Sequence, residues 1–193
     1  MTYAFKCSLL LILFTCGTMT ACSVKNKNKS ESFGSVDQER IDSLKIKIDT
    51  LINILNREIN QNGEVGMVPF PVYNELDTIR YWSIDGVPIR VSAALAYPDK
   101  IVWPTYYIQD GKIIHVRYRF WSRSAPSYAS EHMLYIHNDK TFYCQERRMD
   151  LDAEQTPYSL RSKEFSLCTE PPRDVEENYQ AYWTAINTYL NRK

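Results

Sequence analysis

The chain has 193 residues, 44% of them hydrophobic, and its 23 basic residues are balanced by 23 acidic ones. This length fits one folded domain, and the apolar content is enough to build its core. The charge balance excludes the excess of basic residues through which proteins usually bind nucleic acid, so we expect no nucleic-acid partner.

The N-terminus has the pattern of an export signal. A lysine precedes an apolar run at residues 9–14 that is too short to span a bilayer, and small residues follow it. Ala21 directly before Cys22 resembles the lipobox of bacterial lipoproteins, whose signal is removed and whose new N-terminal cysteine is acylated. Cys16 is the alternative cleavage point, but the β-branched residue before it fits the pattern poorly. We expect residues 1–21 to be the signal peptide and Cys22 to carry fatty acids such as palmitate.

Residues 22–34 are expected to form a flexible tether. This stretch is rich in Ser, Asn and Lys and has one aromatic residue, Phe33, so it cannot build a core of its own. Signal, lipid and tether together predict an exported protein that is anchored in a bacterial membrane by its N-terminal lipid. The outer membrane, on its periplasmic face, is the expected location.

Residues 35–62 are predicted to form a helix. Ser35 and a glutamine three residues later resemble a capping box, and an Asn-Gly pair at residues 62–63 ends the segment. Apolar residues recur at spacings of three and four, at Ile41, Leu44, Ile48, Leu51 and Leu55. Further isoleucines widen this stripe, which favours packing against the same domain over a short coiled coil that self-associates through residues 41–55. Both alternatives remain open.

Residues 63–193 are predicted to form an α+β globular domain that begins with an antiparallel sheet. From Val65 to about Leu167 the apolar period changes to two, and Tyr, Val, Ile, Phe and Trp dominate. Three alternating stretches have turn residues at their centres, namely Asp85-Gly86, Asp110-Gly111 and Asn138-Asp139. Such pairs favour two-residue hairpin turns, so we expect a meander of about five to seven strands.

A second helix is predicted after Pro171-Pro172. Asp174 and Glu177 resemble a capping box at its start. One apolar stripe follows, made of Val175, Tyr179, Tyr182, Ile186 and Tyr189. An amphipathic helix needs an apolar partner, and the Ile/Val/Tyr face of the meander is the available one. We therefore expect this helix to pack on the sheet.

The hairpins with the pattern aromatic-x-x-Asp-Gly-Lys, seen at Tyr107–Lys112, together with the lipobox and the tyrosine-rich last helix, resemble the small uncharacterised lipoproteins of Bacteroidota. The resemblance covers about residues 75–150 and the signal. It implies an antiparallel meander and a location in the cell envelope. It implies no activity, because such families bring no assigned catalytic residues.

The two remaining cysteines predict a disulfide. Of the five cysteines, two leave with the signal and Cys22 is lipidated, so Cys144 and Cys168 are left in an exported, oxidising environment. The alternative is a pair of buried free thiols, because separation along the chain does not show whether the two residues meet.

The strand at residues 112–122 predicts a basic face. Alternation places His115, Arg117, Arg119 and Trp121 opposite the apolar side chains of the same strand. The candidate binding residues are His115, Arg117, Arg119, Trp121 and Arg123, with Arg147 as an extension from the next hairpin. Clustered guanidinium groups need anions, which come either from a ligand or from Glu131, Glu146 and Asp150 of the same chain.

No pattern in the chain predicts catalysis or a metal site. The three histidines lack metal-ligand spacing, and no Gly-x-Ser-x-Gly elbow occurs, so we expect no cofactor, no metal and no catalytic residue. The leading interpretation is a non-enzymatic envelope lipoprotein that binds a protein or a cell-wall partner resembling peptidoglycan. The alternatives are an immunity or inhibitor lipoprotein and a hydrolase of envelope polymers whose site is assembled from loops.

Overall fold

The computed structural model describes residues 33–71, 75, 77–152, 154–169, 171–172 and 175–191. The predicted signal, the lipidation site Cys22 and most of the predicted tether lie outside the described residues, as does Asp174 of the second capping box. The described chain is α+β, as expected, with an N-terminal helix, an antiparallel sheet and a C-terminal helix.

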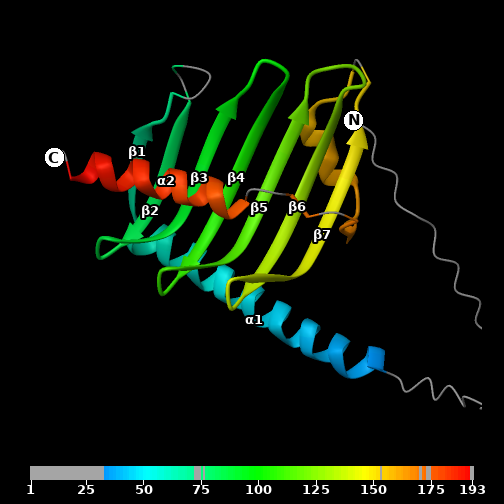
Figure 1. Cartoon of the computed structure of the whole chain (residues 1–193), viewed down its shortest axis with the longest axis horizontal. Helices are drawn as coiled ribbons and strands as arrows, with labels where there is room; N and C mark the ends of the chain where they lie inside the picture. Colours follow the sequence, from blue (N-terminus) through cyan, green and yellow to red (C-terminus); the bar gives the residue numbers. More distant parts are fainter. Residues whose placement is uncertain are drawn as a thin grey trace, which may run out of the picture. The chain divides into compact units, whose positions relative to one another are not determined.

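One sheet of eight antiparallel strands carries the fold, and its strands follow one another in chain order (Figure 1). They are β1 (Glu64–Pro69), β2 (Thr78–Ile84), β3 (Val87–Ala96), β4 (Lys100–Gln109), β5 (Lys112–Ser122), β6 (Tyr128–His137), β7 (Lys140–Asp150) and β8 (Ser166–Leu167). The count exceeds the predicted five to seven because β8 has two residues, which is too few to give a periodic signal.

The turn residues form the hairpins that their chemistry predicts. Both central residues of each turn have positive φ, from 49° at Asp85 to 76° at Gly86, which matches the hairpin turns that suit the twist of a sheet. In the second hairpin the register shifts between Tyr107 and Ile108. As a result Ile113, and not Ile114 as alternation alone suggests, packs against the apolar core.

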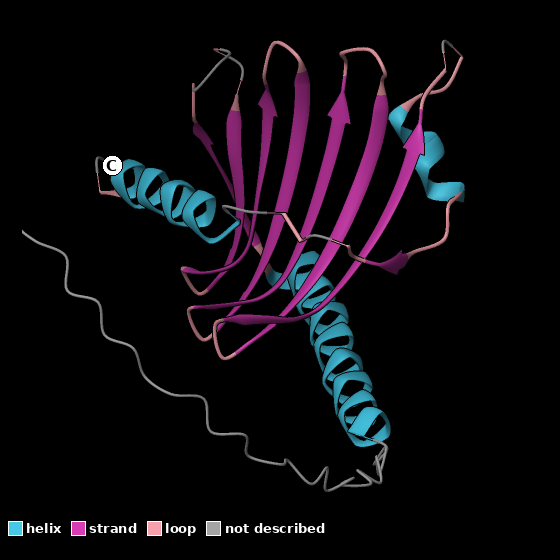
Figure 2. Cartoon of the chain, turned by 45° about the vertical axis from the view of Figure 1, so that its right-hand side comes forward, coloured by secondary structure: helices cyan, strands magenta, loops and turns pink. Residues whose placement is uncertain are grey.

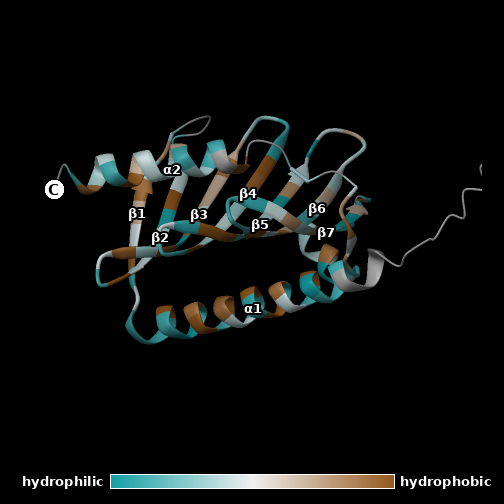
Figure 3. Cartoon of the chain, turned by 60° about the horizontal axis from the view of Figure 1, so that its bottom comes forward, coloured by the Kyte–Doolittle hydropathy of each residue, from teal (hydrophilic) through white to brown (hydrophobic). Residues whose placement is uncertain are grey.

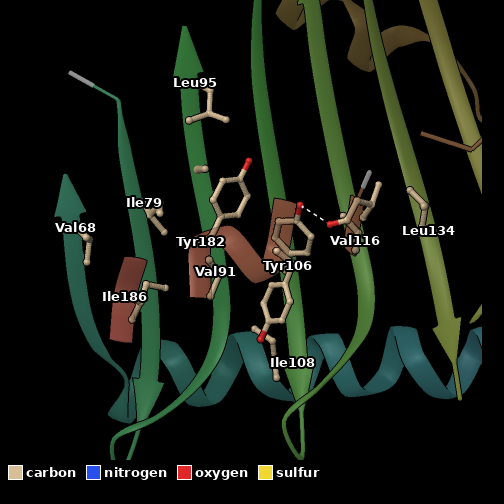
Figure 4. Packing of buried hydrophobic residues seen from close by; sticks show 13 residues of the cluster. Val68, Ile79, Val91, Leu95, Tyr106, Ile108, Val116, Leu134, Tyr182 and Ile186 are labelled. Atoms are coloured by element: carbon tan, nitrogen blue, oxygen red, sulfur yellow. Dashed lines mark hydrogen bonds between the residues drawn. The ribbon is translucent and has the colours of Figure 1, made fainter. Parts of the chain in front are cut away.

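Helix α2 (Val175–Leu190) covers one face of the sheet (Figures 1 and 4). Its predicted stripe lies there: Tyr182 is 3% exposed, Ile186 is fully buried and Tyr189 is half-buried. The core cluster comprises Val68, Ile79, Val91, Ala93, Leu95, Tyr106, Ile108, Val116 and Leu134 of the sheet and Val175, Tyr179, Tyr182 and Ile186 of α2. The Tyr106 hydroxyl donates to the backbone carbonyl of Val175 over 3.1 Å, so the start of α2 is also held by a buried hydrogen bond.

Helix α1 (Phe33–Asn62) lies on the opposite face, so the sheet is sandwiched between two helices (Figure 3). Ile48 and Ile59 are buried, and polar contacts accompany them. Asn56 accepts hydrogen bonds from Arg90 at 2.9 Å and from the Tyr107 hydroxyl at 3.3 Å. The stripe of α1 therefore packs on its own domain, the first of the two alternatives that the sequence left open; self-association stays a prediction.

The helix begins earlier than the predicted boundary at residue 35. It starts at Phe33, so residues 33 and 34, expected in the tether, are helical, and Ser35 lies inside the helix. Gly63 ends it as expected, and its amide donates to the carbonyl of Ile59 over 3.0 Å.

The attachment of α1 can be tested with two isoleucines of the same helix. Ile48 is 6% exposed against the sheet, whereas Ile46 is 65% exposed. Ile48→Ala should lower the free energy of unfolding by about 2 kcal/mol or more, because it removes buried apolar surface. Ile46→Ala should change it by no more than about 0.5 kcal/mol. Urea unfolding of both variants gives the comparison, and equal small effects would mean that α1 does not pack on the sheet in solution.

Candidate functional site

A pocket of about 340 Å³ opens on the face of the sheet away from α2. Strands β3 to β6 and Arg147 of β7 form its floor, and residues of the short helix η1 (Pro157–Ser162) form one wall. Figure 2 shows the η1 helix beside the sheet at the β7 end. We call it the arginine pocket. Its lining residues are Ser92, Trp103, Thr105, Arg117, Arg119, Phe120, Trp121, Ala129, Ser130, Glu131, Arg147, Pro157, Tyr158, Leu160 and Arg161.

Strand pairing places a buried carboxylate among the arginines. Glu131 pairs with Arg119 across β5 and β6 and with Arg147 across β6 and β7, so all three side chains project from the same face. Only 1% of Glu131 is exposed. Its Oε1 accepts a hydrogen bond from Arg117, and its Oε2 accepts one from Nε of Arg147 at 2.7 Å. Nε of Arg119 lies 3.3 Å from the same Oε1 that Arg117 uses. Both carboxylate oxygens are thus already occupied.

The charges of this cluster shift its pKa values. Burial by itself raises the pKa of Glu131, but the hydrogen bonds and charges of Arg117 and Arg147 outweigh it and lower this pKa. Burial lowers the pKa of Arg119, and the charges of Arg117, Arg161 and Arg147 add to the effect against the attraction of Glu131. Burial is the largest of these effects, and repulsion by the neighbouring guanidinium groups adds to it.

The η1 wall is held in place by Arg147. Nη1 of Arg147 donates to the backbone carbonyls of Arg161 and Lys163, each over 3.2 Å, and the guanidinium lies 4.5 Å from the ring centre of Phe165. Leu160 anchors the same segment with 5% exposure. Arg161 lies 5.6 Å from the ring of Tyr158 and has no ion pair with a described residue, so its charge is open to a ligand.

Trp121 adds an indole ring to the lining of the pocket. The buried Nε1 of Trp121 has no hydrogen-bond acceptor among the described residues. A buried N–H without an acceptor costs free energy. Trp121 therefore brings its ring to the lining of the arginine pocket, while its indole nitrogen is enclosed by protein.

The structure brings together some of the predicted binding residues and not others. Arg117, Arg119 and Trp121 line the arginine pocket, whereas Arg123 does not and instead lies 5.8 Å from the ring of Trp121. His115 lies on the predicted face but is only 5% exposed, so the expectation that it belongs to an open basic surface is wrong.

The physical reason for the correction is the cover that α1 provides. His115 contacts the rings of Tyr107 and Tyr135 edge-on, and the hydroxyl of Tyr135 donates to Asp49 of α1 over 3.0 Å. Burial lowers the pKa of His115 to about 4, with opposing contributions from Asp49, which raises it, and from Arg117, which lowers it. The imidazole is therefore neutral at pH 7.

Of the three carboxylates considered as internal partners, Glu131 alone pairs with this face. Glu146 lies 3.7 Å from His132, and Asp150 lies 3.7 Å from Arg148, whose side chain is on the other face of β7. The structural interpretation of the basic face therefore holds for Arg117 and Arg147, which both bond Glu131. Arg119 shares an oxygen with Arg117, and Arg161 has no ion pair with a described residue.

Sequence reasoning missed the contribution of η1. Tyr158 and Arg161 come from a six-residue helix without apolar periodicity. This helix lies in the stretch from Val65 to about Leu167, which is predicted to form the sheet. The one available signal was an arginine and a tyrosine close behind Pro157, and this pattern alone carries no spatial information.

The predicted disulfide is present between Cys144 and Cys168, whose Cα atoms are 5.4 Å apart. Nδ1 of His132 lies 3.9 Å from Sγ of Cys168, so three residues that could bind a metal gather here. Both sulfurs are bonded to each other, and thiolates rather than disulfides are the metal ligands. The disulfide closes the loop that contains η1 and so fixes the far end of the pocket wall.

None of the described helices combines the length and apolar composition that a membrane-spanning segment requires. No protein-family model matches the chain, and comparisons with curated proteins and with solved structures find no match either.

Proposed function

We propose that the protein is a non-enzymatic binding module of the cell envelope that captures an anionic group of its partner in the arginine pocket. The observation that carries the proposal is the charge of the pocket: among its described lining residues, four arginines face one carboxylate. Guanidinium groups bind carboxylate and phosphate in a bidentate manner, and they are common where such groups are recognised. Acidic protein surfaces and cell-wall peptides both carry carboxylates.

The roles of the four arginines differ. Arg117 and Arg147 are committed to Glu131 and hold the floor of the pocket. Arg119 shares an oxygen that Arg117 already uses, and Arg161 has no ion pair with any residue in the described ranges. Arg119 and Arg161 are therefore the groups that would bind the anion.

Thermal unfolding in sulfate, compared with chloride at equal ionic strength, tests the proposal. Sulfate should stabilise the wild type because a ligand that binds only the folded state adds about 2.7 kcal/mol at a hundred times its Kd. Arg161→Gln should lose most of this stabilisation. Arg148→Gln is the matched control, since Arg148 lies on β7 but outside the pocket, and it should behave like the wild type. Equal responses of all three proteins would contradict an anion site at Arg161.

The membrane anchor is a separate part of the proposal and rests on Ala21-Cys22 behind the short apolar run. Two or three acyl chains on one cysteine are enough for stable anchoring, whereas a single chain gives only reversible binding. Labelling of cells with a radioactive fatty acid should mark the wild type and leave Cys22→Ala unlabelled. A labelled Cys22→Ala protein, or a mature N-terminus elsewhere, would refute the anchor.

A further inference from the structure

The hydrogen-bonding groups of the arginine pocket are mostly donors. Arg119 and Arg161 contribute guanidinium N–H groups to the lining. Both oxygens of Glu131, the single acidic group in the described lining, are already occupied. The hydroxyls of Ser92 and Thr105 lie 3.1 Å apart and bond to each other. The charged groups of the pocket that have no committed partner are therefore donors, and they favour a ligand that offers acceptors.

The rest of the lining is mostly apolar. Rings and aliphatic surface come from Trp103, Phe120, Trp121, Ala129, Pro157, Tyr158 and Leu160, and hydroxyls come from Ser130 and Tyr158. A sugar acid suits such a lining poorly, because several of its hydroxyls would lose water against apolar surface. An aromatic or acyl group loses no hydrogen bonds on entering and gains from contact with the rings. The volume of about 340 Å³ is in the range of small-molecule sites, which begins near 300 Å³.

We propose that the arginine pocket selects an apolar organic anion, that is, an aryl or acyl group that carries one carboxylate or phosphoryl head. This inference rests on the proposed function and narrows its ligand class. The head lies against Arg119 and Arg161, and the body lies against Trp103, Trp121 and Leu160 of the lining. Hydrophilic anions, including sugar acids and acidic peptides, bind the same arginines but gain nothing from the apolar part of the pocket.

Isothermal titration calorimetry of the full-length protein with five probes tests the selection. Naphthoate and naphthyl phosphate carry the two heads on one ring system, and naphthylmethanol is their neutral counterpart. Glucuronate and a tetraglutamate peptide represent hydrophilic anions. We expect naphthoate or naphthyl phosphate to bind at least about tenfold more tightly than each of the other three, because only these two probes use both halves of the pocket. The ratio of the affinities for naphthoate and naphthyl phosphate shows whether the pocket prefers a carboxylate or a phosphoryl head.

Variants locate the binding. Arg161→Gln should weaken naphthoate binding severalfold, and Arg148→Gln should leave it unchanged. Both side chains are exposed, so neither change should impair folding. Glucuronate, tetraglutamate or naphthylmethanol binding as tightly as naphthoate would overturn the inference, as would equal naphthoate affinity in wild type and Arg161→Gln.

The outcomes also separate this inference from the proposed function. Sulfate could still stabilise the protein through Arg161 while the naphthyl anions bind no more tightly than the hydrophilic anions. In that case the proposed selection for apolar anions is wrong, and the proposal of an anion site is retained. If Arg161→Gln changes neither the stabilisation by sulfate nor the affinity for any organic anion, both proposals are wrong.

Discussion

Glu131→Ala is expected to lower the free energy of unfolding by about 3–5 kcal/mol, because breaking a buried ion pair leaves an uncompensated charge. The carboxylate is 1% exposed and holds Arg117 and Arg147 at once. Its loss would leave Arg117, Arg119 and Arg147 close together on one face without the acid that now separates their charges. Chemical denaturation monitored by tryptophan fluorescence measures the change.

Two controls separate this effect from general loss of an acidic side chain. Asp150→Ala removes a carboxylate from the adjacent strand whose side chain is 80% exposed, and it should change the stability by no more than about 0.5 kcal/mol. Glu131→Gln keeps the size of the side chain and one acceptor oxygen but removes the charge. The loss of unfolding free energy should therefore lie between those of Glu131→Ala and Asp150→Ala. An effect of Glu131→Ala as small as that of Asp150→Ala would show that the arginines do not depend on this carboxylate.

Because of Glu131, the free energy of unfolding should decrease as the pH falls into the acid range. The pKa of Glu131 is lowered in the folded protein, so its contribution is complete above the ordinary glutamate pKa and is lost as the pH falls through the folded value. His115 acts in the same direction: its folded pKa of about 4 lies below the ordinary 6.5, so stability declines as the pH falls below 6.5. Glu131→Gln should remove the loss of stability that comes from protonation of Glu131. It should leave the loss that comes from protonation of His115.

The pairing of Glu131 also changes what is expected of Arg117. From alternation alone, replacing Arg117 and Arg119 by alanine leaves folding nearly unchanged if the basic face is a binding surface. In the structure Arg117 compensates a buried charge, so its removal should destabilise the fold whether or not the pocket binds a ligand. Arg161→Gln is therefore the better probe of binding.

Most of the fold could be predicted because its signals are local. Turn pairs such as Asp110-Gly111 need only their own backbone geometry to specify a hairpin, and the stripe of α2 needs only its spacing. The site could be predicted only in part. Alternation along β5 placed Arg117 and Arg119 on one face, but whether that face is open depends on segments far away in the chain.

Two distant segments of the chain determine which part of this face is open. Helix α1 covers His115 through contacts that include Asp49 and Tyr135, which are 86 residues apart. The η1 segment closes over the other end of the face and adds Arg161, held there by backbone contacts with Arg147. Contacts between residues 14 or 86 positions apart leave no periodic pattern in the sequence. Sequence reasoning could therefore name the cysteines on either side of η1 but not the position of η1.

The disulfide between those cysteines gives the second large expected effect. Replacing Cys144 and Cys168 together by serine should lower the free energy of unfolding by about 3.5 kcal/mol, the chain-entropy value for a loop of this length, within the usual range of about 2–5 kcal/mol. The separation of 24 residues encloses η1, and β8 supplies only two paired residues to hold the returning chain. Sulfate stabilisation should also weaken, since the wall that carries Arg161 loses its covalent closure. Dithiothreitol should reproduce both changes in the wild type and have no effect on the double variant. Two alkylatable thiols in the oxidised wild type, or equal unfolding midpoints for wild type and variant, would show that the bond does not form or does not stabilise the fold.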